Sequence, residues 1–137
     1  MGNSTTFLTL PAGQRLGTEI VHMEREIDFS VENLAAASTM DVLRLPKGAV
    51  PLQAGWITKT VNTDASARLA VGVATASLAI VSAAVLDAAN SVVITPLTSS
   101  KVLTADDTLR ITGSVATLAE AKVVVFVDYF VSDACRN

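Results

Sequence analysis

Apolar and polar residues alternate along residues 20–32, which read IVHMEREIDFSVE. The apolar positions share odd numbers and are Val21, Met23, Ile27, Phe29 and Val31, with only Arg25 breaking the pattern. A repeat of two residues is typical of a strand with one face in the core and one in solvent, whereas a helix needs a repeat of 3.6. The pattern therefore predicts a long antiparallel strand whose even-numbered face is polar.

Further strand-like runs follow at intervals of roughly ten residues. They cover residues 41–45, 50–61, 67–74, 91–95, 101–103, 108–113 and 123–131. The last run is apolar on both faces, as a central strand is, while Pro51 and Gly55 predict an edge or a bulge in the run over 50–61. Seven or eight short strands separated by turn residues predict an all-β fold, an antiparallel β-sandwich or jelly roll.

Residues 74–90 fit a strand less well. They read ATASLAIVSAAVLDAAN, and the apolar residues at helical spacing among the alanines are Leu78, Val81, Val85 and Leu86, which predicts a short helix or an irregular crossover. The overlapping segment Leu69–Leu86 has eighteen residues without a charge, the lower limit for a transmembrane helix. Ten of those eighteen are Ala, Gly, Ser or Thr, however, and no aromatic residue flanks them, so a membrane span is the weaker interpretation.

The first eighteen residues differ from the rest of the chain. They are rich in Gly and Thr and contain Pro11, and their large apolar residues before Leu16 are Phe7, Leu8 and Leu10. We expect residues 1–18 to form an extended N-terminal arm and residues 19–137 to form one β-sandwich or jelly-roll domain. Isolated apolar residues in such an arm are candidate contacts with a partner or another subunit.

Composition adds a second argument for partners. Half of the 137 residues are hydrophobic, only 17% are charged, and the net charge is −3. A small monomer usually covers its large surface with charges, so we expect part of the apolar surface to be buried against another copy or another protein. The ten basic residues are scattered singly, which predicts no binding to nucleic acid or to an anionic membrane.

Few residues are available for chemistry. The chain has one histidine, His22, and one cysteine, Cys135, and no phosphate loop, dinucleotide fingerprint or nucleophile elbow. The sequence therefore predicts no catalytic, cofactor or metal site. The alternative of an enzyme or a calcium site rests on the row of Glu24, Glu26 and Asp28, which we interpret as a solvated strand face.

Two aromatic residues are further candidate contacts. Trp56 and Tyr129 fit core packing or a subunit contact best. An alternative is a carbohydrate-binding β-sandwich, which would need both rings exposed and coplanar to stack on sugars.

Residues 45–131 carry a pattern of short motifs. Leu45-Pro46-Lys47-Gly48 leads into a long strand, Val71-Gly72-Val73 follows, and Ala105-Asp106-Asp107-Thr108-Leu109 begins a late strand. A valine-rich strand that ends in Tyr129 closes the pattern. The chain in this region resembles the small capsid decoration (cement) proteins and related head structural proteins of tailed bacteriophages.

The resemblance implies a β-sandwich or jelly-roll protein on the capsid exterior that binds the major capsid protein and stabilises the head, commonly as a homotrimer. It also implies that the N-terminal arm lies across a capsid subunit and completes a sheet edge. One departure concerns the turn before the last strand, where related sequences tend to have Gly and this chain has Ala121. Another virion role, as a head-fibre base, a minor capsid protein or a tail protein, remains the alternative within the same class.

Overall fold

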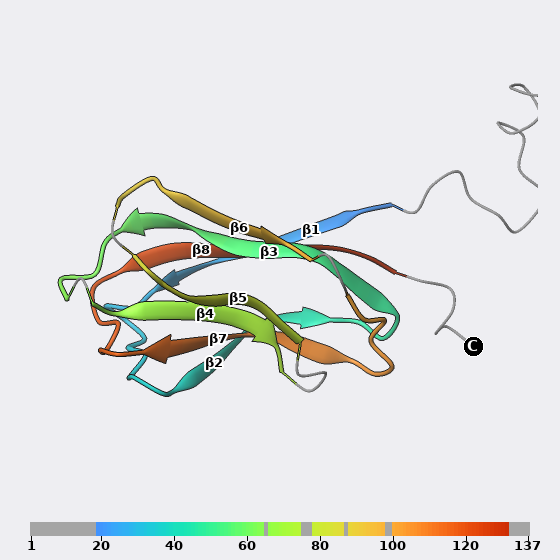
Figure 1. The fold of residues 1–137 in the computed structure, drawn as a ribbon, viewed down its shortest axis with the longest axis horizontal. Coiled ribbons are helices and arrows are strands. Elements are labelled where there is room, and N and C mark those ends of the chain that lie inside the picture. The colour runs from blue at the N-terminus through green and yellow to red at the C-terminus, as the bar shows by residue number, and fades with distance from the viewer. Residues whose placement is uncertain (1–18, 65, 75–77, 87, 98–99, 132–137) are drawn as a thin grey trace, which may run out of the picture.

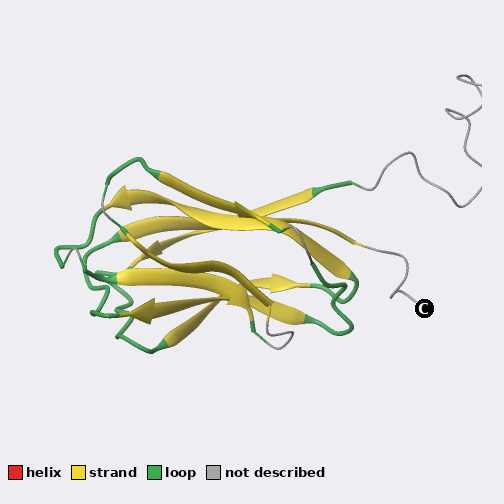
Figure 2. Ribbon diagram, viewed as in Figure 1, coloured by secondary structure: helices red, strands yellow, loops and turns green. Residues whose placement is uncertain are grey.

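The computed structural model describes residues 19–64, 66–74, 78–86, 88–97 and 100–131. Within these ranges the chain forms strands and loops and no helix (Figure 2). The strands are β1 (Val21–Asp28), β2 (Thr39–Leu45), β3 (Ala49–Thr60), β4 (Arg68–Val73), β5 (Leu78–Val85), β6 (Val92–Pro96), β7 (Asp107–Ser114) and β8 (Lys122–Val131). The N-terminal arm predicted for residues 1–18 lies outside the described residues.

The strands form two four-stranded antiparallel sheets that pack face to face (Figure 1). The first sheet has the order β1-β8-β3-β6 and the second the order β2-β7-β4-β5. Four of the antiparallel pairs are those that a single long hairpin of eight strands would form before it rolls up into a sandwich. They are β1 with β8, β2 with β7, β3 with β6 and β4 with β5. This order confirms the predicted all-β sandwich and identifies it as an eight-stranded jelly roll.

Strand β8 is interior because its sequence is apolar on both faces. It pairs with β1 on one side and with β3 on the other. Val123, Val125 and Val127 point inward and are fully buried, while Val124 is half-buried on the opposite face. A strand that is paired on both edges and covered on one face needs this near-continuous apolar run.

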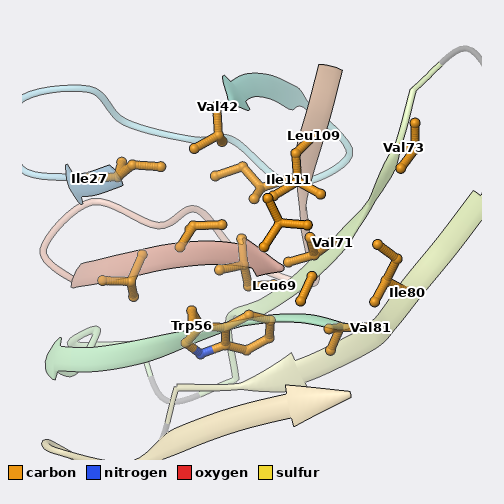
Figure 3. Close-up of a cluster of buried hydrophobic side chains, with 14 of the residues drawn as sticks. Ile27, Val42, Trp56, Leu69, Val71, Val73, Ile80, Val81, Leu109 and Ile111 are labelled. Carbon is orange, nitrogen blue, oxygen red and sulfur yellow. The ribbon is translucent and has the colours of Figure 1, made fainter. Parts of the chain in front are cut away.

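The core lies between the two sheets and is centred on Trp56 of β3 (Figure 3). The indole is fully buried among aliphatic side chains of the second sheet, including Leu69 and Val71 of β4 and Ile111 of β7. The alternation along β4 explains this packing, because Leu69, Val71 and Val73 point inward while the residues between them face outward. The scarcity of aromatics makes the core mainly one of branched aliphatic residues.

Residues 78–85 form strand β5, so the helix or irregular crossover predicted for 74–90 is wrong there. β5 pairs antiparallel with β4, with Val71 opposite Val81 and Gly72 opposite Ala79. Register shifts on both sides of Val71 bend the pair, which breaks the simple alternation and leaves Ile80 and Val81 both buried. Tertiary pairing thus overrides the helical propensity of the alanines.

Within the segment Leu69–Leu86, residues 69–73 and 78–85 accordingly belong to strands β4 and β5 and not to a transmembrane helix. Nowhere among the described residues does the chain form a helix with the length and hydropathy that crossing a membrane requires.

Strand β3 corrects the prediction of an edge at Pro51 and Gly55. It lies between β8 and β6, and the register with β8 shifts between Pro51 and Gln53, so the predicted bulge is present and the edge is not. Pro51 is tolerated because the pairing with β6 begins only at Gln53. Gly55 is required by close approach, since a Cβ there would lie 1.7 Å from the carbonyl oxygen of Val93 on β6.

Two strand boundaries also differ from the predictions. β1 ends at Asp28, four residues before the end of the alternating pattern, because the chain turns into the second sheet while Phe29 stays buried. Arg25 occupies an inward position yet remains exposed, because β1 is an edge strand over which its guanidinium reaches Glu32. Residues 101–103 form no strand, although Leu103 is buried and bonds to the backbone of Ala49.

The position of β8 generates a direct test with a matched control. We expect Val125→Asp to prevent folding, because an unpaired carboxylate in the core costs at least several kcal/mol. Val124→Asp, on the preceding residue, places the same carboxylate on the half-exposed face and should leave a folded protein. Circular dichroism and thermal unfolding of the two variants measure this difference, and a soluble, folded Val125→Asp variant would contradict the central position of β8.

Candidate interaction surfaces

The outer face of the first sheet changes from polar to apolar across its four strands. The strand registers place its side chains in cross-strand rows that start on β1 and end on β6. Two of these rows are Glu26–Val124–Ile57–Val92 and Glu24–Phe126–Gly55–Ile94. In these two rows the face is polar over β1 and apolar over β3 and β6, which we call its polar half and its apolar half; Gln53 and Lys59 of β3 extend the polar half elsewhere.

In the polar half, His22 joins a network of hydrogen bonds. Its Nδ1–H donates to Asp128 Oδ1 at 2.5 Å, and Gln53 Nε2 donates to the other oxygen of the same carboxylate at 2.6 Å. The Nε2 of His22 lies 3.6 Å from Glu24 Oε2. The hydrogen bond with Asp128 raises the pKa of His22, and Glu24 acts in the same direction. The sequence placed His22 on the polar face but gave no sign of its partner on β8.

The carboxylates of β1 are engaged in surface ion pairs. Lys59 Nζ donates to Glu26 at 3.0 Å, and Lys122 Nζ lies 4.0 Å from both Glu26 and Asp28. Hydrogen bonds from the hydroxyl and amide of Ser30 lower the pKa of Asp28, whereas a general acid at neutral pH needs a raised one. Within the described ranges no group of three His, Cys, Asp or Glu side chains is arranged to hold a metal ion. The arrangement supports the interpretation of a solvated face.

In the apolar half, Val92 and Ile94 stand two residues apart on β6 and are 53% and 51% exposed. On β3, Ile57 is the partner of Val92 and Gly55 is the partner of Ile94. Gly55 lets β6 approach β3 closely. Exposed aliphatic side chains on a strand, adjoining other apolar ones, are typical of a surface that contacts another protein. These two residues were not among the contacts predicted from the sequence, because Val92, Val93 and Ile94 are all apolar and the run does not tell which of them face outward.

The two aromatic candidates are both buried. Trp56 is fully enclosed in the core, and Tyr129 is only 6% exposed. The alternative of a carbohydrate-binding module is therefore wrong, because it needed both rings on the surface. The Trp56 side chain packs entirely within the core, so no part of it is accessible to a partner. Tyr129 lines a hollow at the end of the sandwich where β1 begins.

The other predicted contact residues, Phe7, Leu8 and Leu10, lie outside the described residues, as does Cys135.

The loops at the opposite end of the sandwich are tied together by Asn62. This side chain is 4% exposed, and its Nδ2 donates to the carbonyls of Asp64 and Thr117. Its Oδ1 accepts from the amides of Ala119 and Glu120 at 3.1 and 3.2 Å. One amide side chain thus satisfies four backbone groups and fixes the loop before β8 against the loop after β3.

Val115 in this loop region has a strained backbone. Its φ is 70°, and the amide of Ala116 donates to the carbonyl of Ser114 at 2.8 Å, which closes a γ-turn around it. A γ-turn with positive φ is rare and strained, especially at a β-branched residue. The side chain is 65% exposed, so little burial compensates for the strain. Val31 and Val61, in neighbouring loops at the same end, are exposed as well.

Val115 generates a prediction about stability. We expect Val115→Gly to raise the free energy of unfolding by about 1 kcal/mol, because glycine adopts positive φ without the steric cost that a β-branched residue meets. Val61→Gly is the matched control, since Val61 is an exposed loop valine outside the positive-φ region and glycine there should destabilise the fold. Chemical denaturation measures both changes, and a loss of stability in Val115→Gly would argue against strain at this turn.

The network around His22 generates a prediction about pH. We expect NMR titration to give His22 a pKa above its ordinary 6.5, and Asp128→Asn to lower it. A raised folded-state pKa means that the pairing stabilises the fold fully below pH 6.5 and loses this effect as the pH rises through the folded-state pKa. The stability difference between the wild type and Asp128→Asn should therefore be largest below pH 6.5 and shrink as the pH rises through the folded-state pKa of His22. An unchanged His22 titration in the variant would contradict the pairing.

Comparison with known proteins shows which fold this is. No family model matches the sequence, and no curated protein matches it. A chain in the capsid asymmetric unit of cyanophage Pam1 matches with a TM-score of 0.66 and 19% identity, over 90% of this chain and 92% of that chain. A chain in the capsid of Ralstonia phage GP4 matches with a TM-score of 0.62 and 14% identity, over 91% and 92%.

A third match is a chain in the acidic stable capsid of Helicobacter pylori bacteriophage KHP30, with a TM-score of 0.59 and 14% identity. It covers 86% of this chain and 92% of that chain. Because each alignment covers nearly all of both chains, the matched chains are about as long as this one. The eight-stranded jelly roll of this protein is thus a fold also found, nearly end to end, in chains of three bacteriophage capsid structures.

Proposed function

We propose that this chain is a structural protein of a bacteriophage virion, and specifically a decoration (cement) protein on the outer surface of the head. The observation that carries the proposal is the nearly end-to-end fold match with chains in three phage capsid structures. The role is one of assembly and stabilisation without catalysis. The ion-paired carboxylates of β1 and the single histidine, bound to Asp128, are consistent with such a role.

Two observations support decoration over other roles in the virion. The motifs in residues 45–131 resemble those of cement proteins, and the matched capsid chains are as small as this one. A protein of 14.2 kDa that clamps neighbouring shell subunits needs a firm surface rather than a deep binding site. A rigid sandwich with an apolar half on one outer face meets that need.

We assign the contact with the major capsid protein to the apolar half of the outer face, around Val92 and Ile94. These side chains are half exposed on a regular, paired strand, so they present a preformed surface whose burial releases water without ordering a loop. The low charge of the chain supports a second contact between copies, in a homotrimer of about 43 kDa from a 14.2 kDa chain. Several weak contacts per trimer would together give firm attachment.

The proposal is tested by rebinding to phage heads from which the chain has been stripped. We expect the wild type to rebind, and the pair Val92→Asp and Ile94→Asp to bind at least about ten-fold more weakly, because two carboxylates would lose their water in the contact. The control pair is Ala79→Asp and Ala83→Asp, at exposed positions on β5, the edge strand of the other sheet, which should rebind like the wild type.

Two outcomes would overturn the decoration role or its contact. Failure of the wild type to rebind, with the chain found by labelling at the tail or at fibre bases, would favour the alternative virion roles. Equal rebinding by the Val92 and Ile94 variant would remove the assigned contact.

A further inference from the structure

A hollow of about 350 Å³ lies between the two sheets at the end of the sandwich where β1 begins. It is lined by residues of β1, of β2 and the following turn, of the loop before β7, and of β8; these are Met23, Arg44, Leu45, Pro46, Asp106 and Tyr129. Methionine, leucine, proline and the tyrosine ring make its lining mainly apolar. It is open to solvent on one side, so an extended segment can enter it.

The hollow has polar groups that lack partners. Tyr129 is more than nine-tenths buried, yet among the described residues its hydroxyl has no hydrogen-bond partner. The guanidinium of Arg44 at the rim forms no ion pair within the same ranges. The Tyr129 oxygen is not among the enclosed polar atoms that lack a partner, so it opens to solvent in the hollow, where a bound peptide can replace water as its partner. Both groups can donate to carbonyl oxygens, so the hollow suits a peptide with apolar side chains and an accessible backbone.

The chain itself supplies such a peptide. Eighteen residues precede Glu19, and Phe7, Leu8 and Leu10 are large apolar residues among them. The described chain starts beside the hollow, because Val21 pairs with Tyr129 and Met23 lines the hollow. Glu19 follows Leu10 by nine positions, which extend to roughly 30 Å. This reach is comparable to the length of a small domain, so the segment can pass to an adjoining copy.

We propose that this hollow binds the Phe7–Leu10 segment of a neighbouring copy, so that the copies of the assembly exchange their N-terminal arms. This inference rests on the homotrimer of the proposed function and names its contact. Each copy would give one segment and receive one, a head-to-tail arrangement that closes into a ring. Ile20 is 61% exposed, and the start of the described chain before β1 leads away from the sheets in Figure 1, which favours a neighbour's hollow over the chain's own.

Disulfide trapping tests the exchange. Cys135 is replaced by Ser in all chains, and Leu8→Cys copies are coexpressed with Arg44→Cys copies under mild oxidation. We expect a linked pair of about 28 kDa, twice the mass of the 14.2 kDa chain, on a non-reducing denaturing gel. The matched control is Thr39→Cys in place of Arg44→Cys, because Thr39 is exposed on the same strand but does not line the hollow.

Three outcomes would overturn the proposal. Linkage of the control at the same yield as Arg44→Cys would show unspecific contact, and absence of any linked pair would show that the segment does not reach the hollow. A chain with both Leu8→Cys and Arg44→Cys that forms its disulfide internally, at the mass of one chain, would place the segment in its own hollow. Linkage specific to Arg44→Cys supports the exchange.

A second measurement needs no added cysteine. We expect removal of residues 1–18 to lower the solution mass from about 43 kDa to that of one chain, 14.2 kDa, while circular dichroism retains its β-sheet signal. A trimer that survives the deletion would overturn the proposal. Rebinding to phage heads is measured separately. A trimer that has exchanged its arms but does not bind heads would refute only the decoration role. Head binding without linkage would refute only the arm exchange.

Discussion

The pairing of β8 with both β1 and β3 is the constraint on which the rest of the molecule depends. Through it the first sheet has an interior strand whose inward valines meet Trp56 and the second sheet. The same strand contributes Val124, Phe126 and Asp128 to the outer face, so it also places the polar network of His22 next to the apolar half of β3 and β6. The buried face and the mixed outer face of the first sheet both depend on this one strand, which is paired on both edges.

The two ends of the sandwich differ in character. At one end the loops are bound to one another by Asn62, and Val115 forms a strained turn. At the other end the chain enters β1 beside a hollow lined by Tyr129, whose hydroxyl has no partner among the described residues. The loops at the Asn62 end are thus fixed against one another, while the hollow at the other end is open to solvent.

The two proposed contact surfaces differ in the conformational entropy that binding would cost. Val92 and Ile94 are held on a paired strand, so their burial against a partner orders little new chain. The hollow at Tyr129 is different, because fixing any peptide segment in it would cost conformational entropy, which hydrogen bonds from Tyr129 and Arg44 would offset in part. The ion pairs over β1 are exposed and weak, as is typical of a half-face that stays in contact with solvent.

The sequence by itself determined the fold class and most of the strands, because alternation of apolar and polar residues is a local property that each strand carries alone. The run at 123–131 identified the interior strand, and the short motifs of 45–131 pointed to phage head proteins. Tertiary structure decided what depends on residues far apart. Strand β5 formed against β4 despite helix-favouring alanines, Trp56 became enclosed, and His22 met Asp128 from a strand more than a hundred residues away. The apolar half around Val92 and the hollow at Tyr129 likewise exist only through cross-strand neighbours, which no local pattern specifies because strand order and register are set by the packing of the whole core.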